Sequence, residues 1–257
     1  MKVNTLSAIV ITRNEERNIR ECLESVKWVN EIIIVDAGST DRTIEIAKEF
    51  TKNIFNRPWD GYGVAKNFGL SQCTSEWVLW LDADERVTLE LQKEMLCMLS
   101  SVDQKVTALS MPRRANFLGK WIYHCGWYPG RITRVFRRSA GRFTEERVHE
   151  RLDIQGVTVP LKSDIIHYTD PDLKHYFEKF NKYTSLAVEE LVECKKKFSI
   201  FKLIVNPIWV FVKMYIFRLG FLDGIPGLIL CVLSANYVFT KYAKLWEHSV
   251  QQERVNR

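Results

Sequence analysis

EWVLWLDADE, residues 76–85, is an apolar run that ends in three carboxylates within four residues. The apolar part is typical of a buried strand, and Asp82 and Asp84 flank a small alanine at its end. Hard divalent cations prefer oxygen ligands of this kind, and Mg²⁺ commonly joins one or two carboxylates to substrate phosphates. The alternative is that the acids cap the following helix, but Thr88 already offers a cap there. The stretch therefore predicts a metal site at the end of a buried strand.

Strand and helix patterns alternate through the first hundred residues. Apolar runs at 6–11, 31–35 and 76–81 indicate buried strands, and apolar residues at helical spacing follow each of them. This order is typical of an α/β fold, a Rossmann-like and mostly parallel sheet flanked by helices, in which ligands bind beyond the carboxyl ends of the strands. Asp36 ends the second run as Asp82 ends the third. We therefore expect carboxylates from separate strands to face one crevice.

The helical patterns differ in length and in their starting signals. Ser39 or Thr40 would cap the helix that follows the second strand. The longest pattern runs from Asp172 to Phe198, with an apolar stripe on one side and three lysines at its end. We expect one long amphipathic helix there.

The chain is expected to contain a sheet domain followed by a helical region. Strand patterns return between residues 104 and 170, where they would extend the sheet and form the second wall of the crevice. We therefore expect a sheet domain over residues 1–171, divided into halves at 1–110 and 111–171 that form the two walls of the crevice. A helical region would occupy residues 172–257.

The net charge of +6 is moderate, but its distribution is uneven. Residues 104–144 contain no Asp or Glu and nine basic residues. Such a stretch suggests an anionic partner, either phosphates or an acidic lipid surface, although a solvated basic face gives the same pattern. No helix-turn-helix, zinc or RNA-binding motif accompanies it, so nucleic acid is not an expected partner.

The cysteines and the N-terminus bear on the compartment. The six cysteines are scattered without a CxxC pair or metal-ligand spacing, which favours reduced thiols over disulfides. The first apolar segment, residues 6–11, is too short for a secretory signal and runs into charged residues. We therefore expect the catalytic part to be cytoplasmic.

The tail from Phe198 onward is strongly apolar. Residues 200–217 are interrupted by two lysines and a proline, whereas residues 224–240 carry no charge over 17 positions, near the lower limit for a membrane span. Aromatic and lysine residues flank both segments, as in helices that lie in the membrane interface. Three interpretations remain open, namely in-plane or monotopic membrane helices, a packed accessory hairpin and a true span.

Four motifs of the first 110 residues occur together in one order: AIVITRNE (8–15), IVDAGSTD (34–41), KNFG (66–69) and LDAD (81–84). This combination resembles the family 2 glycosyltransferases, which have the GT-A nucleotide-sugar fold. The resemblance implies transfer of a sugar from a nucleotide donor, with a divalent metal, Mg²⁺ or Mn²⁺, as cofactor. It also implies that residues 1–171 are the catalytic domain, with a nucleotide-sugar-binding half at 1–110 and an acceptor-side half at 111–171, and that residues 172–257 are a helical, membrane-associating region.

The same resemblance implies a set of site residues. Asp84 would hold the metal, Asp36 the uracil or ribose, and Lys66 the base or the phosphates. Position 37 is alanine where relatives often carry a second acid, so the nucleotide contact would depend more heavily on Asp36. The full nucleotide-sugar set is Thr12, Arg13, Asn14, Glu15, Asp36, Gly38, Ser39, Lys66, Asn67, Asp82 and Ala83.

Motifs of the second half look like a narrower subgroup that adds a sugar, often glucose, to the inner core of lipopolysaccharide. They are RRANFLG (113–119), GWYP (126–129), RVFRR (134–138), VHE (148–150), HY (167–168) and GFLDG (220–224). This resemblance implies a hexose, most simply glucose from a UDP-linked donor, and a lipid-linked saccharide acceptor. It also implies work at the cytoplasmic face of the bacterial inner membrane by a peripheral or monotopic protein of unspecified oligomeric state.

Inverting transfer is a single displacement that needs a base to take the proton of the acceptor hydroxyl. Glu150 is the candidate by its position in the family pattern, with Glu145 and Glu146 as reserves. A surface ion pair with Arg147 or Arg151 is the alternative role of Glu150.

The remaining candidates contact the acceptor, the phosphates or the metal. His149 would position the acceptor or the base, and His167 would be a second metal ligand or a structural histidine. Guanidinium groups suit phosphate, so four arginines are candidates for acceptor or diphosphate contacts: Arg113, Arg114, Arg131 and Arg134.

Two other functions fit the same motifs. One is a polyprenyl-phosphate or other cell-envelope polysaccharide glycosyltransferase. The other is a non-catalytic nucleotide-sugar-binding membrane adaptor that has kept the fold. The combination of Asp36, Asp82 and Asp84 with a candidate base favours an enzyme, because an adaptor has no need of metal ligands.

Overall fold

The computed structural model describes residues 4–144 and 151–255. The chain forms two compact units, a sheet unit of Met1–Arg114 with Gly130–Tyr168 and a helical unit of Ala115–Pro129 with Thr169–Arg257. The sequence was expected to divide at residue 171, and the units divide between Tyr168 and Thr169 and on either side of the segment 115–129. The segment 115–129 differs, because it belongs to the helical unit although its sequence continues the strand pattern.

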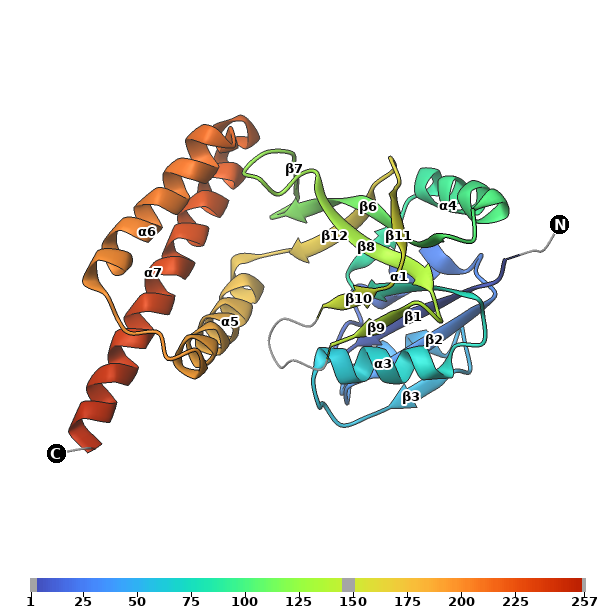
Figure 1. Cartoon of the computed structure of the whole chain (residues 1–257), viewed down its shortest axis with the longest axis horizontal. Coiled ribbons are helices and arrows are strands. Elements are labelled where there is room, and N and C mark those ends of the chain that lie inside the picture. The colour runs from blue at the N-terminus through green and yellow to red at the C-terminus, as the bar shows by residue number, and fades with distance from the viewer. Residues whose placement is uncertain (1–3, 145–150, 256–257) are drawn as a thin grey trace. The chain divides into compact units, whose positions relative to one another are not determined.

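The main sheet follows the order β3-β2-β1-β4-β8-β6-β12-β5, with β7 and β11 paired to β6 (Figure 1). The first four of these strands are parallel, while β8 is antiparallel to both β4 and β6. A separate two-stranded sheet holds β9 and β10. The strand bounds are β1 Leu6–Thr12, β2 Glu31–Asp36, β3 Ile54–Asn56, β4 Trp77–Asp82, β5 Glu85–Val87, β6 Val106–Phe117, β7 Lys120–Ile122, β8 Gly130–Arg137, β9 Gly141–Phe143, β10 Leu152–Ile154, β11 Val157–Pro160 and β12 Ile165–Asp170.

Helices cover both faces of the parallel strands, as the alternation of strands and helices predicts. Even-numbered residues of β1, such as Val10, pack with one set of helices, and odd-numbered residues, such as Ile9, pack with α3. Gly69 allows this second contact, because a Cβ there would lie 2.7 Å from Ile9 Cγ2. The helices of this unit are α1 Ile19–Val26, α2 Thr43–Ala47, α3 Tyr62–Gln72 and α4 Leu89–Ser101.

In the helical unit, α6 and α7 lie side by side, and α5 packs against α7 (Figure 1). Asp172 caps α5 by accepting a hydrogen bond from the His175 amide. Lys244 of α7 donates to oxygens of three α5 residues, at distances of 2.8–3.1 Å. The bounds are α5 Leu173–Glu193, α6 Ile200–Val212, a π-helical turn Lys213–Phe217, a 3₁₀ turn Gly220–Asp223 and α7 Gly224–Val255.

The caps of two helices test the sequence signals. Thr88 caps α4 as expected, accepting from the Leu91 amide, so the acids at 82–85 are free of that role. The cap expected at Ser39 or Thr40 was wrong, because α2 begins only at Thr43. Ser39 instead donates to Asp36, and the Asp41 carboxylate accepts from the Thr43 amide. Residues 39–41 therefore form a turn that local side-chain hydrogen bonds stabilise, and the helix begins only after it.

Candidate active site

The carboxyl ends of three parallel strands meet at one edge of the sheet. Thr12 at the end of β1 lies opposite Asp36 at the end of β2, and Ile11 lies opposite Asp82 at the end of β4. The strand ends therefore come together as expected. Thr12 adds an unexpected feature, because its Oγ1 is buried and has no hydrogen-bond partner among the described residues.

The loops after β1 and β2 hold each other in place. The Asn14 amide donates to Ser39 Oγ at 2.9 Å, and Asn14 Oδ1 accepts from the Thr40 amide at 2.8 Å. Asn14 has a positive φ of 55°, which asparagine tolerates better than most residues. The Glu15 amide donates to Thr43 Oγ1. Much of both motifs is therefore used to join the two loops, whereas the neighbouring Arg13 is exposed.

Asp36 is fully buried and serves its own loop. Its Oδ2 accepts from the Gly38 and Ser39 amides at 3.0 and 2.9 Å, and Oδ1 accepts from Ser39 Oγ. Gly38 has φ +82°, a conformation that favours glycine. The Asp36 carboxylate therefore shapes this turn. Its expected contact with the base or ribose stays a prediction.

Asp82 belongs to a charged network with an inner and an outer carboxylate. Arg134 Nη2 lies 2.7 Å from Asp82 Oδ2 and 2.5 Å from Glu85 Oε1. The Asp82 side chain is 39% exposed, whereas the side chains of Arg134 and Glu85 are 3% and 0% exposed. The Asp82 amide also donates to Glu85 Oε2 at 3.2 Å. A buried guanidinium therefore joins a buried acid to one that faces solvent.

This network separates the pKa values of the two acids. Burial alone would raise the pKa of Asp82, but the charge of Arg134, with help from Lys66, more than offsets it and lowers that pKa. Burial raises the pKa of Glu85, and repulsion by Asp82 adds to it, against the opposing charge of Arg134. Asp82 is therefore the acid that is held ionised.

Trp80 brings two cations to the same place. Its ring centroid lies 3.5 Å from Arg134 Cζ and 4.0 Å from Lys66 Nζ, and Lys66 is only 3% exposed. A cation over an indole face is attracted by the ring, which helps to offset the burial of both charges. Arg134 was expected at the acceptor or diphosphate. It is 2% exposed instead, and Asp82 and Glu85 hold it.

Asn67, one residue after Lys66, has a structural contact. Its Nδ2 donates to the Phe143 carbonyl at 2.8 Å and its Oδ1 accepts from the Phe143 amide at 3.0 Å. These paired bonds attach α3 to β9, so the Asn67 amide group expected at the nucleotide is already engaged. Ala83 is also buried, in the core between Asp82 and Asp84, which leaves only its backbone for a ligand.

Asp84 and His167 form the pair that best fits a metal. Asp84 Oδ2 lies 3.3 Å from His167 Nε2, and the two side chains are 13% and 16% exposed. Asp84 Oδ1 is buried without a hydrogen-bond partner among the described residues. A buried carboxylate oxygen without a donor is a natural ligand for a cation. β12 brings His167 here by pairing with β5, where His167 lies opposite Glu85.

Two protein ligands would leave the rest of the coordination to substrate and water. Within residues 4–144 and 151–255, no group of three or more His, Cys, Asp or Glu has metal-binding geometry. Mg²⁺ is commonly held by one or two carboxylates together with substrate phosphates, which fits Asp84, whereas the imidazole of His167 suits Mn²⁺ better. The residues present therefore fit such an ion.

Two of the other expected arginines, Arg114 and Arg131, have partners within the sheet unit. Arg114 Nε lies 3.4 Å from Asp164 Oδ2, and Arg131 Nη1 donates to the Leu161 carbonyl at 2.9 Å. Arg113 is half-buried at the end of the β6–β8 pairing. Among the other basic residues of 104–144, Arg137 pairs with Glu76. The basic stretch is therefore partly neutralised by acids distant in sequence.

The candidate base and its neighbour lie outside the described residues. Glu150, His149 and the reserves Glu145 and Glu146 all fall in 145–150. Sequence reasoning also missed Glu85 and Trp80 as members of the site. Both stand in the stretch EWVLWLDADE, residues 76–85. The signal for Glu85 was that a third acid exceeds what a two-carboxylate metal motif requires.

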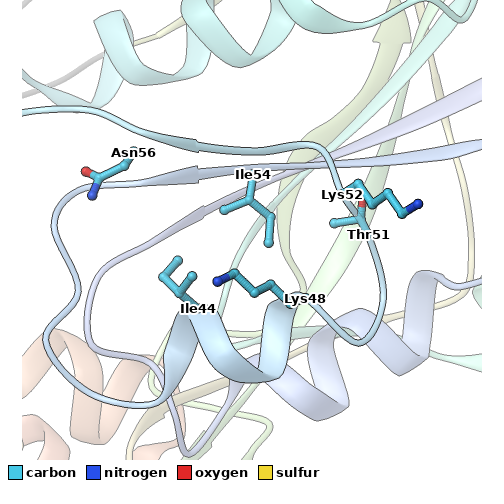
Figure 2. Close-up of a pocket in the computed structure, with 6 residues that line it drawn as sticks. All are labelled: Ile44, Lys48, Thr51, Lys52, Ile54 and Asn56. Atoms are coloured by element: carbon cyan, nitrogen blue, oxygen red, sulfur yellow. The ribbon is translucent and has the colours of Figure 1, made fainter.

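A cavity of about 510 Å³ lies elsewhere in the sheet unit, beside α2 and β3 (Figure 2). Ile44, Ile54 and the aliphatic parts of Lys48 and Lys52 contribute to its lining, with Thr51 and Asn56. The lining includes no acid and none of the expected site residues. We therefore assign the chemistry to the strand ends and not to this cavity.

Comparisons with known proteins agree with the fold and the motifs. The family model "Glycosyl transferase family 2" matches residues 7–148. The lipopolysaccharide core biosynthesis glycosyltransferase LpsC of Rhizobium meliloti is 31% identical over 259 residues, covering 98% of this chain and 95% of the relative. An uncharacterised glycosyltransferase of Rickettsia typhi is also 31% identical, covering 97% and 89%.

Among solved structures, a mannosyltransferase of Pyrobaculum calidifontis in complex with GDP-Man and Mn²⁺ has a TM-score of 0.56 at 14% identity. It covers 95% of this chain and 87% of that one. This likeness confirms the GT-A fold expected from the motifs. The family match extends over more than half of the chain, and the relatives match over nearly all of it. The chain is therefore a glycosyltransferase and belongs to family 2.

Proposed function

We propose that the chain transfers a hexose, most simply glucose from a UDP-linked donor, to a lipid-linked saccharide such as the inner core of lipopolysaccharide. We further propose that transfer is metal-dependent, inverts the anomeric centre and takes place at the cytoplasmic surface of the inner membrane. The observation that carries the proposal is the cluster of Asp82, Asp84 and His167, with its buried and unpartnered Asp84 oxygen. The similarity to LpsC extends through the helical unit, which supports an acceptor of the same class.

The residues of the sheet unit divide the work of donor binding. Asp84 and His167 would hold a divalent cation, which supplies charge neutralisation for the departing diphosphate when it is bound. Asp82, kept ionised by Arg134, would accept a hydrogen bond from a ribose hydroxyl. The Asp36 turn and the Asn14 loop would present their outer faces to the nucleoside. Lys66 places a positive charge beside Asp82, near the expected position of the phosphates.

The transfer itself exchanges one bond at the anomeric carbon. The acceptor oxygen attacks that carbon, the bond to the diphosphate oxygen breaks, and the hydroxyl proton passes to a carboxylate. Glu150 is the proposed carboxylate. Glu150→Gln should stop transfer and leave donor affinity within about twofold, whereas unchanged turnover would move the role to Glu145 or Glu146.

Thermal stabilisation by a panel of nucleotide sugars, with Mn²⁺, Mg²⁺ or a chelator, tests the proposal. A true donor at a hundred times its dissociation constant should stabilise the fold by about 2.7 kcal/mol. We expect the response to a UDP-hexose to need the divalent cation and to disappear in Asp84→Ala. Stabilisation by a donor without hydrolysis or transfer would favour the adaptor. Transfer to a polyprenyl phosphate and not to a core saccharide would favour the alternative of a polyprenyl-phosphate glycosyltransferase.

A further inference from the structure

The corner between α6 and α7 has an unusual backbone. Lys213–Phe217 forms a π-helical turn, and Leu219, which follows it, has a positive φ of 53° although it is not glycine. Leucine in this conformation costs of order 1 kcal/mol or more. Single π-turns inside helices occur frequently at functional sites. The chain therefore accepts an unfavourable backbone conformation at Leu219 to form this corner.

Contacts from the segment 115–129 hold this corner. The buried Asp223 carboxylate accepts from the Tyr123 and His124 amides at 3.3 and 2.9 Å and lies 3.0 Å from His124 Nδ1. The Cys125 amide donates to the Arg218 carbonyl at 3.0 Å. The contacts of Asp223 therefore explain the aspartate of the GFLDG motif by the fold of the corner. The hydrogen bond from Cys125 also holds the backbone of Arg218 in place.

A cavity of about 360 Å³ opens at this corner. Lys213, Arg218 and Ser234 supply its polar groups, and Trp127, Val210 and Met214 supply apolar lining. The stem of Arg218 lies beside Gly126, where an added Cβ would be 3.5 Å from Arg218 Cγ. The cavity thus combines two cations and a hydroxyl with apolar walls.

The two cations are not neutralised by the protein. Neither Lys213 nor Arg218 forms an ion pair or a side-chain hydrogen bond with any residue that the structure describes. Asp223 is engaged by His124 and by backbone amides. A pair of exposed cations beside this cavity matches the charge of a phosphate group, and the cavity is large enough to admit one together with the group that carries it.

Large apolar side chains are exposed at the same corner of the helical unit. Phe217, Leu219 and Leu222 at the corner are 65%, 45% and 55% exposed, and α6 presents further exposed apolar residues. By length and composition, residues 200–217, which are α6 with its π-helical turn, and residues 220–252, which include most of α7, could each cross a membrane. Lys202 and Lys213 interrupt the stretch 200–217, which favours helices that lie in the plane of the membrane surface over a simple span.

We propose that the cavity at the α6–α7 corner binds the phosphate of an anionic phospholipid, with the acyl chains against the exposed apolar side chains of α6 and the corner. Lys213 and Arg218 hold the phosphate oxygens, and Ser234 donates to one of them. The inference rests on the proposed function in one respect, that the acceptor is presented at a membrane surface. It adds a lipid headgroup site that fixes the helical unit on that surface.

Vesicle binding of the full-length protein tests this site without donor or acceptor. We compare phosphatidylcholine vesicles with vesicles of equimolar phosphatidylcholine and phosphatidylglycerol at about 0.15 M salt. Lys213→Gln/Arg218→Gln should weaken binding to the anionic vesicles about thirty-fold and leave binding to neutral vesicles unchanged. Lys195→Gln/Lys196→Gln removes the same charge at the end of α5, and we expect less than about a threefold effect.

A neutral variant separates the cavity from diffuse attraction. Ser234→Leu fills the cavity and leaves the charge unchanged, and it should also weaken anionic binding several-fold. Equal losses in the two double variants, or wild-type binding by Lys213→Gln/Arg218→Gln, would overturn the proposal. Competition by inorganic phosphate alone, with no preference for lipid, would assign the cavity to a soluble anion and likewise overturn it.

The result is independent of the proposed chemistry. Donor hydrolysis in vesicle-free solution should proceed at the wild-type rate in Lys213→Gln/Arg218→Gln. Loss of vesicle binding with hydrolysis intact supports the lipid site. Absence of hydrolysis in every variant, the wild type included, would count against the proposed function and leave the vesicle result to decide the lipid site.

Discussion

The sheet unit and the helical unit treat charge and apolar surface in opposite ways. In the sheet unit, Arg134, Glu85 and Lys66 are almost completely buried and lie among one another's charges and the Trp80 ring. In the helical unit, most of the large apolar residues from Ile200 to Ile225 are exposed. The sheet unit therefore buries charged groups, whereas the helical unit exposes apolar ones.

This difference indicates what each unit needs from its surroundings. Buried ionic networks are expensive unless every member is paired, and they are retained where their geometry matters. The sheet unit is therefore built to hold carboxylates in fixed positions for a small polar ligand. Extended exposed apolar surface marks an interaction with an apolar partner. The helical unit is therefore incomplete in water, and a membrane surface is the partner that we propose.

The largest effect is expected at Asp84, where the sheet unit meets its ligand. Asp84→Ala should lower turnover about 100- to 1,000-fold, the range seen when one electrostatic contact to developing charge is removed. Stability should change little, because one oxygen of Asp84 has no partner to lose among the described residues. Product formation and a thermal melt measure the two effects. Turnover near the wild-type level would remove Asp84 from the metal site.

Substitution of the inner carboxylate, Glu85, should mainly lower stability, whereas substitution of the outer carboxylate, Asp82, should mainly lower turnover. Glu85→Gln leaves the buried Arg134 with one fewer counter-charge and should cost about 3 kcal/mol of unfolding free energy. Asp82→Asn, at a side chain that is 39% exposed, should cost less than about 1 kcal/mol but reduce donor turnover more. Denaturant melts and donor kinetics on both variants give the comparison. Equal destabilisation by the two changes would mean that no inner and outer carboxylate can be distinguished.

The exposed surface of the helical unit should respond in membranes and not in water. Ile204→Gln/Ile208→Gln removes two side chains that are 54% and 61% exposed, and vesicle binding should weaken by about 2 kcal/mol, roughly thirty-fold. Leu89→Gln/Leu96→Gln on α4 is a matched control, with two exposed leucines in the sheet unit. The melting temperatures of both double variants should equal that of the wild type. Equal vesicle binding by the two variants would contradict a membrane role for α6.

The parts of the fold that sequence predicted are those set by local pattern. The apolar runs that became β1, β2 and β4 are continuous and short, and each ends close to its predicted residue. Their carboxyl ends had to meet because parallel strands with helical connections share one edge. The position of Asp82 and Asp84 followed from this alone.

The parts that sequence did not predict depend on contacts between distant residues. Arg134 lies 49 positions from Glu85, and no local pattern shows that a basic stretch supplies the counter-charge of a carboxylate cluster. The hydrogen bonds of Asp36 with Ser39 and of Asn67 with Phe143 were also not predicted, because the motifs alone do not show which contacts shape the loops. A motif identifies which residues occur together, and it does not separate those that touch a ligand from those that shape its loops.

The smallest effect is expected at Glu31, where the sheet unit satisfies a carboxylate by hydrogen bonds instead of by an ion pair. Burial alone would raise the pKa of Glu31, but bonds from Ser7, Thr74 and Ser75 lower it. A lowered pKa adds stability above the unfolded value of about 4.3, and this stability is lost as the pH falls through the folded value. Glu31→Gln should therefore cost about 1 kcal/mol near neutral pH, and the difference from wild type should shrink below about pH 4. Melting temperatures across this range measure it. A difference that stays constant into acid would show that the loss is one of shape, and that this carboxylate contributes nothing through its charge.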